Sequence, residues 1–437
     1  MLRKVDLDRP PMVRLGDAPR GGFFEGGLEY NPPARGVWNI VHTGMLIPEM
    51  HEIFACAQGC LRGVILTAAE MNAIERLSWI SVSEQDMFDG TLESDVVDGV
   101  SQIIDTLSYR PRAVLLYLSC IHLFAGCDFD IIIKQLSEKY PDINFSDCYM
   151  TPTMRKTISP DAKMRMQLYD ALRPTELDPK SVSIIGNDRA TDEGSEFVRV
   201  IKDNGFTLRD LTACKTYDEY LDMAKSALNI AYLPTAALGC EELSKRLGSE
   251  HLYLPNSFDS EEIRANMARL CEKLGVAVPD LKAEEQAAED ALATARDVVG
   301  DTRIAIDFTA VTQPFGLAKL LCERGFNVQY IINDALGEDG AAFDFLKENF
   351  PNIEIYSAVN VNMLHFPEEE HERVLAIGQK AAHYFSTDYF VNIVQNGGYY
   401  GFTGISSIAG LIAEAAKEPK DRRTLISHKG IGCESCL

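Results

Sequence analysis

Cysteines are the residues of this chain best suited to chemistry, and the eleven of them are unevenly placed. Cys56 and Cys60 stand in the segment FACAQGCLRGV, and Cys120 and Cys127 stand in SCIHLFAGCDFD. Four soft thiolate ligands on two neighbouring loops suit an iron–sulfur cluster or a zinc ion. The alternative is a set of buried thiols that act only as small apolar side chains, since the paired CxxC motifs of a zinc ribbon do not occur.

Both loops are predicted to follow a strand and precede a helix. The apolar run AVLLYLSC (113–120) is typical of a buried parallel strand, and it ends at Cys120. In doubly wound sheets, ligands bind outside the carboxyl ends of the strands. Around Cys60, small residues allow close approach of a bulky inorganic ligand, and the first N–H groups of the next helix favour an anionic one.

Histidines near these loops are candidates for proton transfer, because imidazole titrates near neutral pH. His122 is the first candidate, and His42 and His51 precede the first loop. For each of them, a hydrogen-bonded histidine without a catalytic role is the alternative. Arg62 follows Cys60 closely and would offset the charge of a cluster, unless it is only a surface residue.

Other motifs carry less weight. The CxxC pair Cys433 and Cys436 is either a redox or metal-binding pair, or two thiols of a tail without a specific role. Cys240 is expected to be a core thiol at the start of a helix. The turn IGNDRATDEG (185–194) lacks the glycine patterns of nucleotide-binding loops, so we expect no nucleotide to bind this chain.

Strand-like and helix-like segments alternate along the chain, which predicts βα units. The predicted strands cover 37–43, 113–120, 143–150, 182–187, 227–234, 303–309, 327–333, 352–358 and 389–396. The predicted helices cover 62–78, 130–142, 193–205, 240–248, 314–324, 340–349, 367–384 and 398–417, and residues 260–300 are expected to form a solvated, acidic helical link.

The alternation predicts an α/β protein with three doubly wound, Rossmann-like domains and parallel sheets. Residues 1–36 are expected to form an irregular arm over the first domain. The three domains are expected at 37–178, where the four cysteines lie, at 179–300, and at 301–437.

Composition limits the class of protein. The chain has 437 residues, a net charge of −23, 46% hydrophobic and 24% charged residues, so it has enough apolar residues for a full core. The acidity argues against nucleic acid or an anionic membrane as a partner and suits docking to a basic patch of another protein. We find no apolar stretch of membrane-spanning length and no signal peptide at the start, and therefore expect a cytoplasmic protein.

Three landmarks resemble the nitrogenase component 1 family, which includes the molybdenum–iron protein subunits and the catalytic subunits of protochlorophyllide reductase. The C-terminal landmark is NGGYYGFTGISSIAGLIAEA, and the resemblance covers essentially the whole chain. The two cysteine landmarks consist of Gly59, Cys60, Ser119, Cys120, Gly126 and Asp128.

This resemblance implies an iron–sulfur oxidoreductase that receives electrons from a separate ATP-dependent reductase of the iron-protein type. It implies a homodimer or a heteromer with a second component 1-like subunit, in which Cys60 and Cys120 match two ligands of a shared [4Fe–4S] or larger cluster. The family's first cysteine has no counterpart in ARGVWNIVHT. Cys56, Cys127 or the equivalent residues of a second subunit are expected to complete the ligand set.

The cysteine and histidine that hold the nitrogenase active-site cofactor have no clear counterpart, so nitrogen fixation is not expected. The resemblance instead favours reduction of a small organic substrate. One alternative is a scaffold on which an iron–sulfur cluster or metal cofactor is assembled without turnover. A zinc site and a small-molecule binding protein with doubly wound domains are further alternatives.

Overall fold

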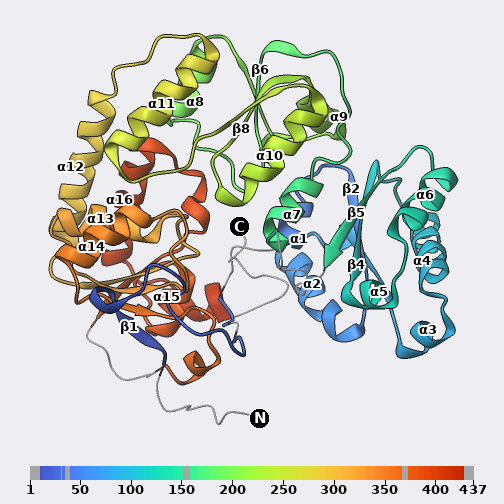
Figure 1. Ribbon diagram of the computed structural model, residues 1–437, viewed down its shortest axis with the longest axis horizontal. Helices are drawn as coiled ribbons and strands as arrows, with labels where there is room; N and C mark the ends of the chain where they lie inside the picture. Colours follow the sequence, from blue (N-terminus) through green and yellow to red (C-terminus); the bar gives the residue numbers. More distant parts are fainter. Residues whose placement is uncertain (1–9, 31, 35–39, 151–157, 367–372, 428–437) are drawn as a thin grey trace. The chain divides into compact units, whose positions relative to one another are not determined.

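The computed structural model describes residues 10–30, 32–34, 40–150, 158–366 and 373–427 (Figure 1). The described residues form two compact units. The first unit draws on 1–37, 191–204 and 256–428, and the second on 38–190 and 205–255. Three sheets are present, and all but one of their strand pairs are parallel. The α/β class with parallel sheets is therefore confirmed.

In the part of the chain that the structure describes, none of the helices combines the length and the apolar character needed to cross a membrane.

The first sheet of the second unit has the strand order β3-β2-β4-β5. Helices pack on both of its faces, with α4 and α6 on one face and α1, α2 and α7 on the other (Figure 1). The strands are β2 (Met50–Cys56), β3 (Leu77–Ser81), β4 (Ala113–Ser119) and β5 (Asn144–Met150). The helices are α1 (Ile40–Gly44), α2 (Gln58–Glu70), α3 (Glu84–Asp89), α4 (Leu92–Thr106), α5 (Cys120–Ala125), α6 (Phe129–Lys139) and α7 (Pro160–Gln167).

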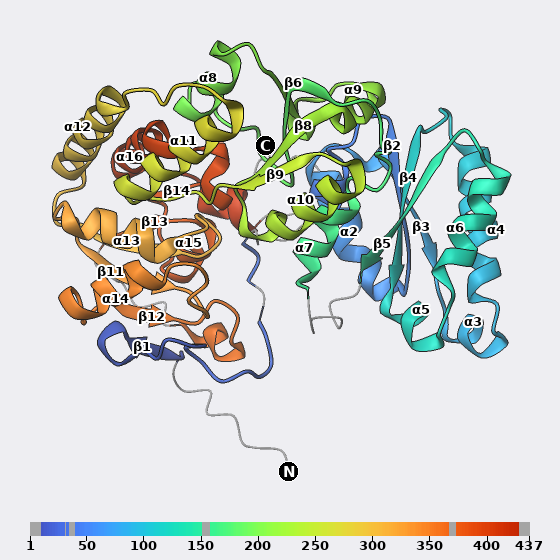
Figure 2. The ribbon, with the colours of Figure 1, turned by 45° about the horizontal axis from the view of Figure 1, so that its top comes forward.

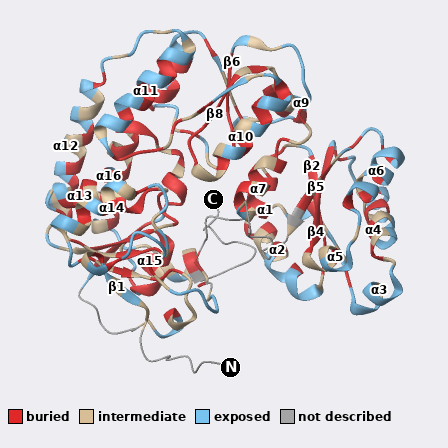
Figure 3. Cartoon of the chain, viewed as in Figure 1, coloured by how far each residue is buried: buried red, intermediate tan, exposed pale blue. Residues whose placement is uncertain are grey.

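Every residue of the two central strands, β2 and β4, is buried (Figure 3). Covering a parallel sheet on both faces produces such an apolar run, so the predicted strands at 113–120 and 143–150 are confirmed. Ile53, Val114 and Leu116 form the core against α4 and α6. This rigid layer positions the loops that follow β2 and β4.

Two predictions in this region are wrong. The described part of the predicted strand 37–43 is the helix α1, in which all five residues are buried. A short apolar run does not distinguish a buried strand from a buried helical turn, and tertiary contacts decide. The predicted helix 62–78 instead begins at Gln58 and ends at Glu70, because Asn72 adopts a left-handed backbone (φ 54°). Its last predicted residues belong to β3.

The second sheet of this unit has the order β7-β6-β8-β9. α10 packs on β8 and β9 and also on α7 of the neighbouring sheet. It begins at Pro234, which suits the first helical turn, and stops at Gly248, whose φ of 75° favours glycine. The elements are β6 (Asp178–Ile184), β7 (Thr207–Asp210), α9 (Tyr217–Leu221), β8 (Ser226–Ala231), α10 (Pro234–Leu247) and β9 (Glu250–Tyr253).

The sheet of the first unit has the order β1-β12-β11-β10-β13-β14. The strands are β1 (Met12–Arg14), β10 (Arg303–Asp307), β11 (Val328–Ile332), β12 (Glu354–Tyr356), β13 (Val374–Ile377) and β14 (Phe390–Val391). The helices are α8 (Glu196–Asp203), α11 (Ser260–Leu274), α12 (Lys282–Val299), α13 (Pro314–Glu323), α14 (Gly340–Asn349), α15 (Gln379–Tyr384) and α16 (Gly401–Lys417).

The predicted helix 367–384 is largely wrong. Residues 367–372 lie outside the described residues, 374–377 form β13, and helix α15 covers only 379–384. β13 is fully buried between β10 and β14, and its apolar residues are typical of such a central strand.

The predicted position of the N-terminal arm is also wrong. Its described residues lie on the first unit, where β1 pairs antiparallel with β12. Phe23 stacks on Phe343 at 5.8 Å between ring centroids. An unpaired edge strand exposes backbone hydrogen-bonding groups, and β1 satisfies those of β12.

The helical segment 260–300 is not a solvated link. α12 packs along α16 within the first unit (Figure 2). It buries Ala288, Leu292 and Ala295, which form an apolar face. The many acidic residues of the segment led to the prediction of a solvated helix.

Candidate functional site

The structure places both cysteine loops at the same edge of one sheet. β2 and β4 are hydrogen-bonded neighbours, and Ala55 pairs with Leu118. β2 ends at Cys56 and β4 ends at Ser119, so the next residues along both strands leave the sheet together. This is the carboxyl edge, where doubly wound sheets bind their ligands.

Cys60 and Cys120 occupy the first turns of the helices that follow these strands. Cys60 lies in the first turn of α2 and is exposed, and Cys120 is the first residue of α5 and is partly exposed. The Cys120 thiol lies 3.9 Å from the carbonyl oxygen of Met150. Both thiols are thus accessible to a ligand at the edge of the sheet.

Cys56 and Cys127 have less suitable surroundings. Cys56 is fully buried, and burial together with nearby Cys60 raises the pKa of its thiol to about 12. Burial and the Glu93 carboxylate raise the pKa of the partly exposed Cys127 thiol. A metal ligand must be a thiolate, so the raised pKa values disfavour Cys56 and Cys127 as ligands.

Among the described residues, no group of three or more His, Cys, Asp or Glu side chains is placed to hold a metal ion. The soft donors Cys60 and Cys120 fit an iron–sulfur cluster as part of a ligand set.

His122 is fully buried behind Cys120. The Ser119 N–H donates to His122 Nδ1 at 3.3 Å, so the neutral imidazole carries its proton on Nε2. Nε2 is buried and has no hydrogen-bond partner in the described part of the chain. Burial lowers the pKa of His122, and its contact with Ser119 fixes the first turn of α5.

The other predicted candidates are not gathered at this edge. His51 lies near the start of β2, with Nδ1 2.6 Å from the Tyr109 hydroxyl and Nε2 2.9 Å from the Ser78 hydroxyl. His42 is buried with Nδ1 3.9 Å from Asp188, and Arg62 is exposed on α2.

The remaining thiols are placed as follows. Cys240 is buried in the middle of α10, so the predicted core thiol is confirmed, although not at the helix start. Cys433 and Cys436 lie outside the described residues.

Glu52 is a functional candidate that sequence reasoning missed. Its carboxyl group is fully buried within β2, and neither oxygen has a hydrogen-bond partner among the described residues. Burial raises its pKa well above the usual value, although Arg76 acts in the opposite direction. A charged residue within the otherwise apolar run of a central strand was the available signal.

Comparisons with known proteins support the family resemblance. The family model described as Nitrogenase component 1 type Oxidoreductase matches residues 41–417. A search of curated proteins finds no match. A solved structure described as "Nitrogenase Cp1 at pH 6.5" superposes with a TM-score of 0.69 at 15% identity, covering 92% of this chain and 96% of the other. Another, "Nitrogenase Cp1 at pH 5", gives 0.57 at 13% identity, covering 93% of each chain.

These two structures share the fold of this chain across nearly its whole length. The family model covers well over half of the sequence, including both cysteine loops and the last long helix. The chain therefore belongs to the nitrogenase component 1 type oxidoreductase family.

Proposed function

We propose that this chain is an iron–sulfur oxidoreductase subunit that takes electrons from an ATP-dependent reductase of the iron-protein type and reduces a small organic substrate. The observation that carries the proposal is the position of Cys60 and Cys120, in the first turns of helices that follow neighbouring parallel strands. Both thiols are accessible there, and family membership gives the type of chemistry.

Cys60 and Cys120 would hold the cluster, with the same residues of a second subunit, or Cys56 and Cys127, as the other ligands. The cluster, when bound, accepts and passes on single electrons. The protein's part is to fix the ligands: the β2–β4 pairing positions both loops, and the Ser119–His122 hydrogen bond holds the first turn of α5. Hydrogen bonds next to a ligand tune a metal site.

His122 remains the proposed proton donor. With Nδ1 accepting from Ser119, its Nε2–H is the proton that it offers. Nε2 has no hydrogen-bond partner among the described residues, so the proton would leave from that atom and not through the Ser119 contact at Nδ1.

The net charge of −23 supports a protein partner with a basic surface. All nine cysteines of the described residues are free thiols, which supports a reducing cytoplasm as the compartment. We propose a homodimer or a heteromer with a second component 1-like subunit as the working assembly.

The test is anaerobic purification with iron and acid-labile sulfide analysis, followed by turnover with an iron-protein-type reductase and ATP. The proposal expects bound iron and sulfide, and substrate reduction that requires ATP. An iron-free protein with intact thiols after anaerobic purification and cluster reconstitution contradicts it. Zinc in place of iron contradicts it as well.

The exposure of Cys60 favours a second candidate function, a scaffold that assembles a cluster and hands it on. An exposed ligand gives an acceptor protein access to the cluster. Incubation of the loaded protein with an apo acceptor separates the two functions. Cluster transfer without ATP-dependent turnover supports the scaffold, whereas turnover with a retained cluster supports the reductase.

A further inference from the structure

A cavity of about 650 Å³ lies at the amino end of the β2–β5 sheet, at the opposite edge from the two cysteine loops. Arg76, just before β3, lines it together with Tyr109. The loop that follows β7 adds Cys214 and Lys215. Its volume falls within the range of about 300–1,000 Å³ that is typical of small-molecule sites.

Arg76 is held rigidly at this cavity. Its Nε, Nη1 and Nη2 atoms donate to the carbonyl oxygens of Met50, Met45 and Ile47 at 3.2, 3.1 and 2.6 Å. A guanidinium group has five N–H donors, so two remain after these three bonds. Among the described residues, no carboxylate forms an ion pair with it. The structure therefore presents a preorganised cation with spare donors.

The acids near Arg76 form no ion pair with it in the described part of the chain. Glu52 interacts electrostatically with Arg76, and burial raises the pKa of Glu52 well above its usual value. Glu75 also interacts electrostatically with Arg76, but the two N–H donors left on the guanidinium group still favour an anion at its open side.

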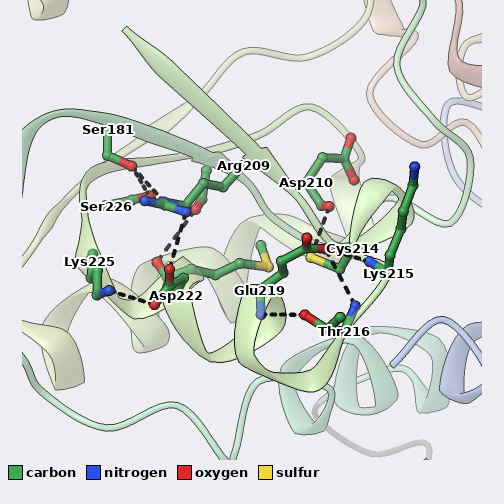
Figure 4. Close-up of polar contacts among 12 residues, drawn as sticks. Ser181, Arg209, Asp210, Cys214, Lys215, Thr216, Glu219, Asp222, Lys225 and Ser226 are labelled. Atoms are coloured by element: carbon green, nitrogen blue, oxygen red, sulfur yellow. Dashed lines mark hydrogen bonds and ion pairs between the residues drawn. The ribbon is translucent and has the colours of Figure 1, made fainter. Parts of the chain in front are cut away.

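Lys215 adds a second cation at the same cavity. Its backbone N–H donates to Glu219 Oε2 at 2.6 Å, and the preceding Cys214 thiol donates to the Asp210 carbonyl oxygen at 3.4 Å (Figure 4). The loop is thus fixed, and the Lys215 side chain is exposed where it lines the cavity. It is available for a ligand.

We propose that this cavity binds a small organic carboxylate, with the carboxylate on Arg76 and an apolar body against Met45, Leu46 and Pro48. Glu49 and Glu75 also line the cavity and disfavour the higher charge of phosphate. The apolar wall stabilises a carbon chain but not an inorganic anion. This site does not depend on the proposed function, since it lies at the opposite edge of the sheet from Cys60 and Cys120.

Titration calorimetry of the full chain with hexanoate tests the proposal, with hexanamide as the uncharged probe of equal size. We expect hexanoate to bind at millimolar concentrations and hexanamide to bind about tenfold more weakly. Leu46→Glu places a carboxylate in the cavity without removing any Arg76 hydrogen bond, and Leu46→Gln is its uncharged match. Leu46→Glu should weaken hexanoate binding about tenfold relative to Leu46→Gln.

Three results would overturn the proposal: no heat of binding with hexanoate, equal binding of hexanoate and hexanamide, or equal affinity in the two Leu46 variants. Inorganic phosphate is the third probe. Phosphate binding that competes with hexanoate at similar concentration would overturn the selectivity for a carboxylate. All measurements use the protein as purified, and iron content does not enter their outcome.

Discussion

The Glu196 carboxylate of α8 accepts the backbone N–H groups of Phe402 and Thr403 at the first turn of α16. The buried Glu196 side chain thus caps the N-terminus of α16, although the two residues in contact, Glu196 and Phe402, are 206 positions apart in the chain. Gly401 makes this possible, because a Cβ atom there would lie 2.1 Å from Glu196 Oε1. The two helices of the first unit are joined by this contact.

Replacing Glu196 should therefore destabilise the first unit. Glu196→Ala leaves two buried N–H groups without an acceptor and removes the negative charge at a helix N-terminus, at an expected cost of about 2–4 kcal/mol in the free energy of unfolding. Urea unfolding measures it. Glu193→Ala is the control, since its ion pair with Lys202 is exposed and contributes at most about 1 kcal/mol. Equal effects would contradict the capping role.

Gly401→Ala should lower the free energy of unfolding to a similar extent while leaving Glu196 itself unchanged. The new methyl group collides with Glu196 Oε1, and Gly401 has a φ of 68°, which disfavours alanine. We expect a cost of about 2–4 kcal/mol, measured by the same unfolding assay. Gly410→Ala, in the same helix with no neighbour within 4 Å, should be neutral or stabilising. A neutral Gly401→Ala would show that the contact is dispensable.

Cys60→Ser and Cys120→Ser should each lower the iron bound after anaerobic reconstitution by at least about half, because serine is a poor ligand for iron–sulfur clusters. Cys322→Ser is the matched control, as this thiol is buried in α13 far along the chain from the proposed ligands. Iron retained equally in all three variants would remove Cys60 and Cys120 from the ligand set. Circular dichroism confirms that each variant is folded.

His51 should make the protein less stable in mild acid. Burial and Arg76 lower the pKa of His51 from 6.5 to about 4, so the folded protein keeps it neutral while the unfolded chain takes up a proton. The neutral His51 side chain contributes fully to the free energy of unfolding above pH 6.5. This contribution, about 3 kcal/mol, is lost as the pH falls from 6.5 towards 4. His51→Gln should flatten the stability profile over this window, whereas exposed His365→Gln should not. The same pH dependence of stability in His51→Gln and His365→Gln would refute this role of His51.

Glu52 should destabilise the protein increasingly as the pH rises. Burial raises its pKa well above 4.5, so the unfolded chain releases a proton that the folded state retains. Relative to Glu52→Gln, the natural protein should lose about 1.4 kcal/mol per pH unit above 4.5, until the buried carboxyl ionises. Unfolding measured at several pH values checks this. A pH-independent difference between the two proteins would mean that Arg76 keeps the carboxylate ionised.

Local patterns were enough to predict much of the fold. β4 was predicted closely because a strand buried on both faces must be apolar throughout. β5 was predicted within one residue of its observed start, and α14 was predicted at its observed bounds. The position of Cys120 after a strand also followed from short-range patterns. β2, the strand before Cys60, was not predicted, and the strand expected at 37–43 is the helix α1 in its described part. The family resemblance depended on the order and spacing of its motifs along the chain, and the family match bears it out.

Tertiary structure decided what depends on distant neighbours. Residues 40–43 fall in a predicted strand and residues 374–377 in a predicted helix, yet the first form a helix and the second a central strand, because the surrounding elements satisfy different backbone groups. The arm lies on the first unit because β12 offers a free edge there. Burial separates Cys56 from Cys60 and raises the pKa of Glu52, and folding places Arg76 against three backbone carbonyl groups. The sequence alone did not reveal these differences, since the free energy of a charge depends on surroundings that form only when the chain folds.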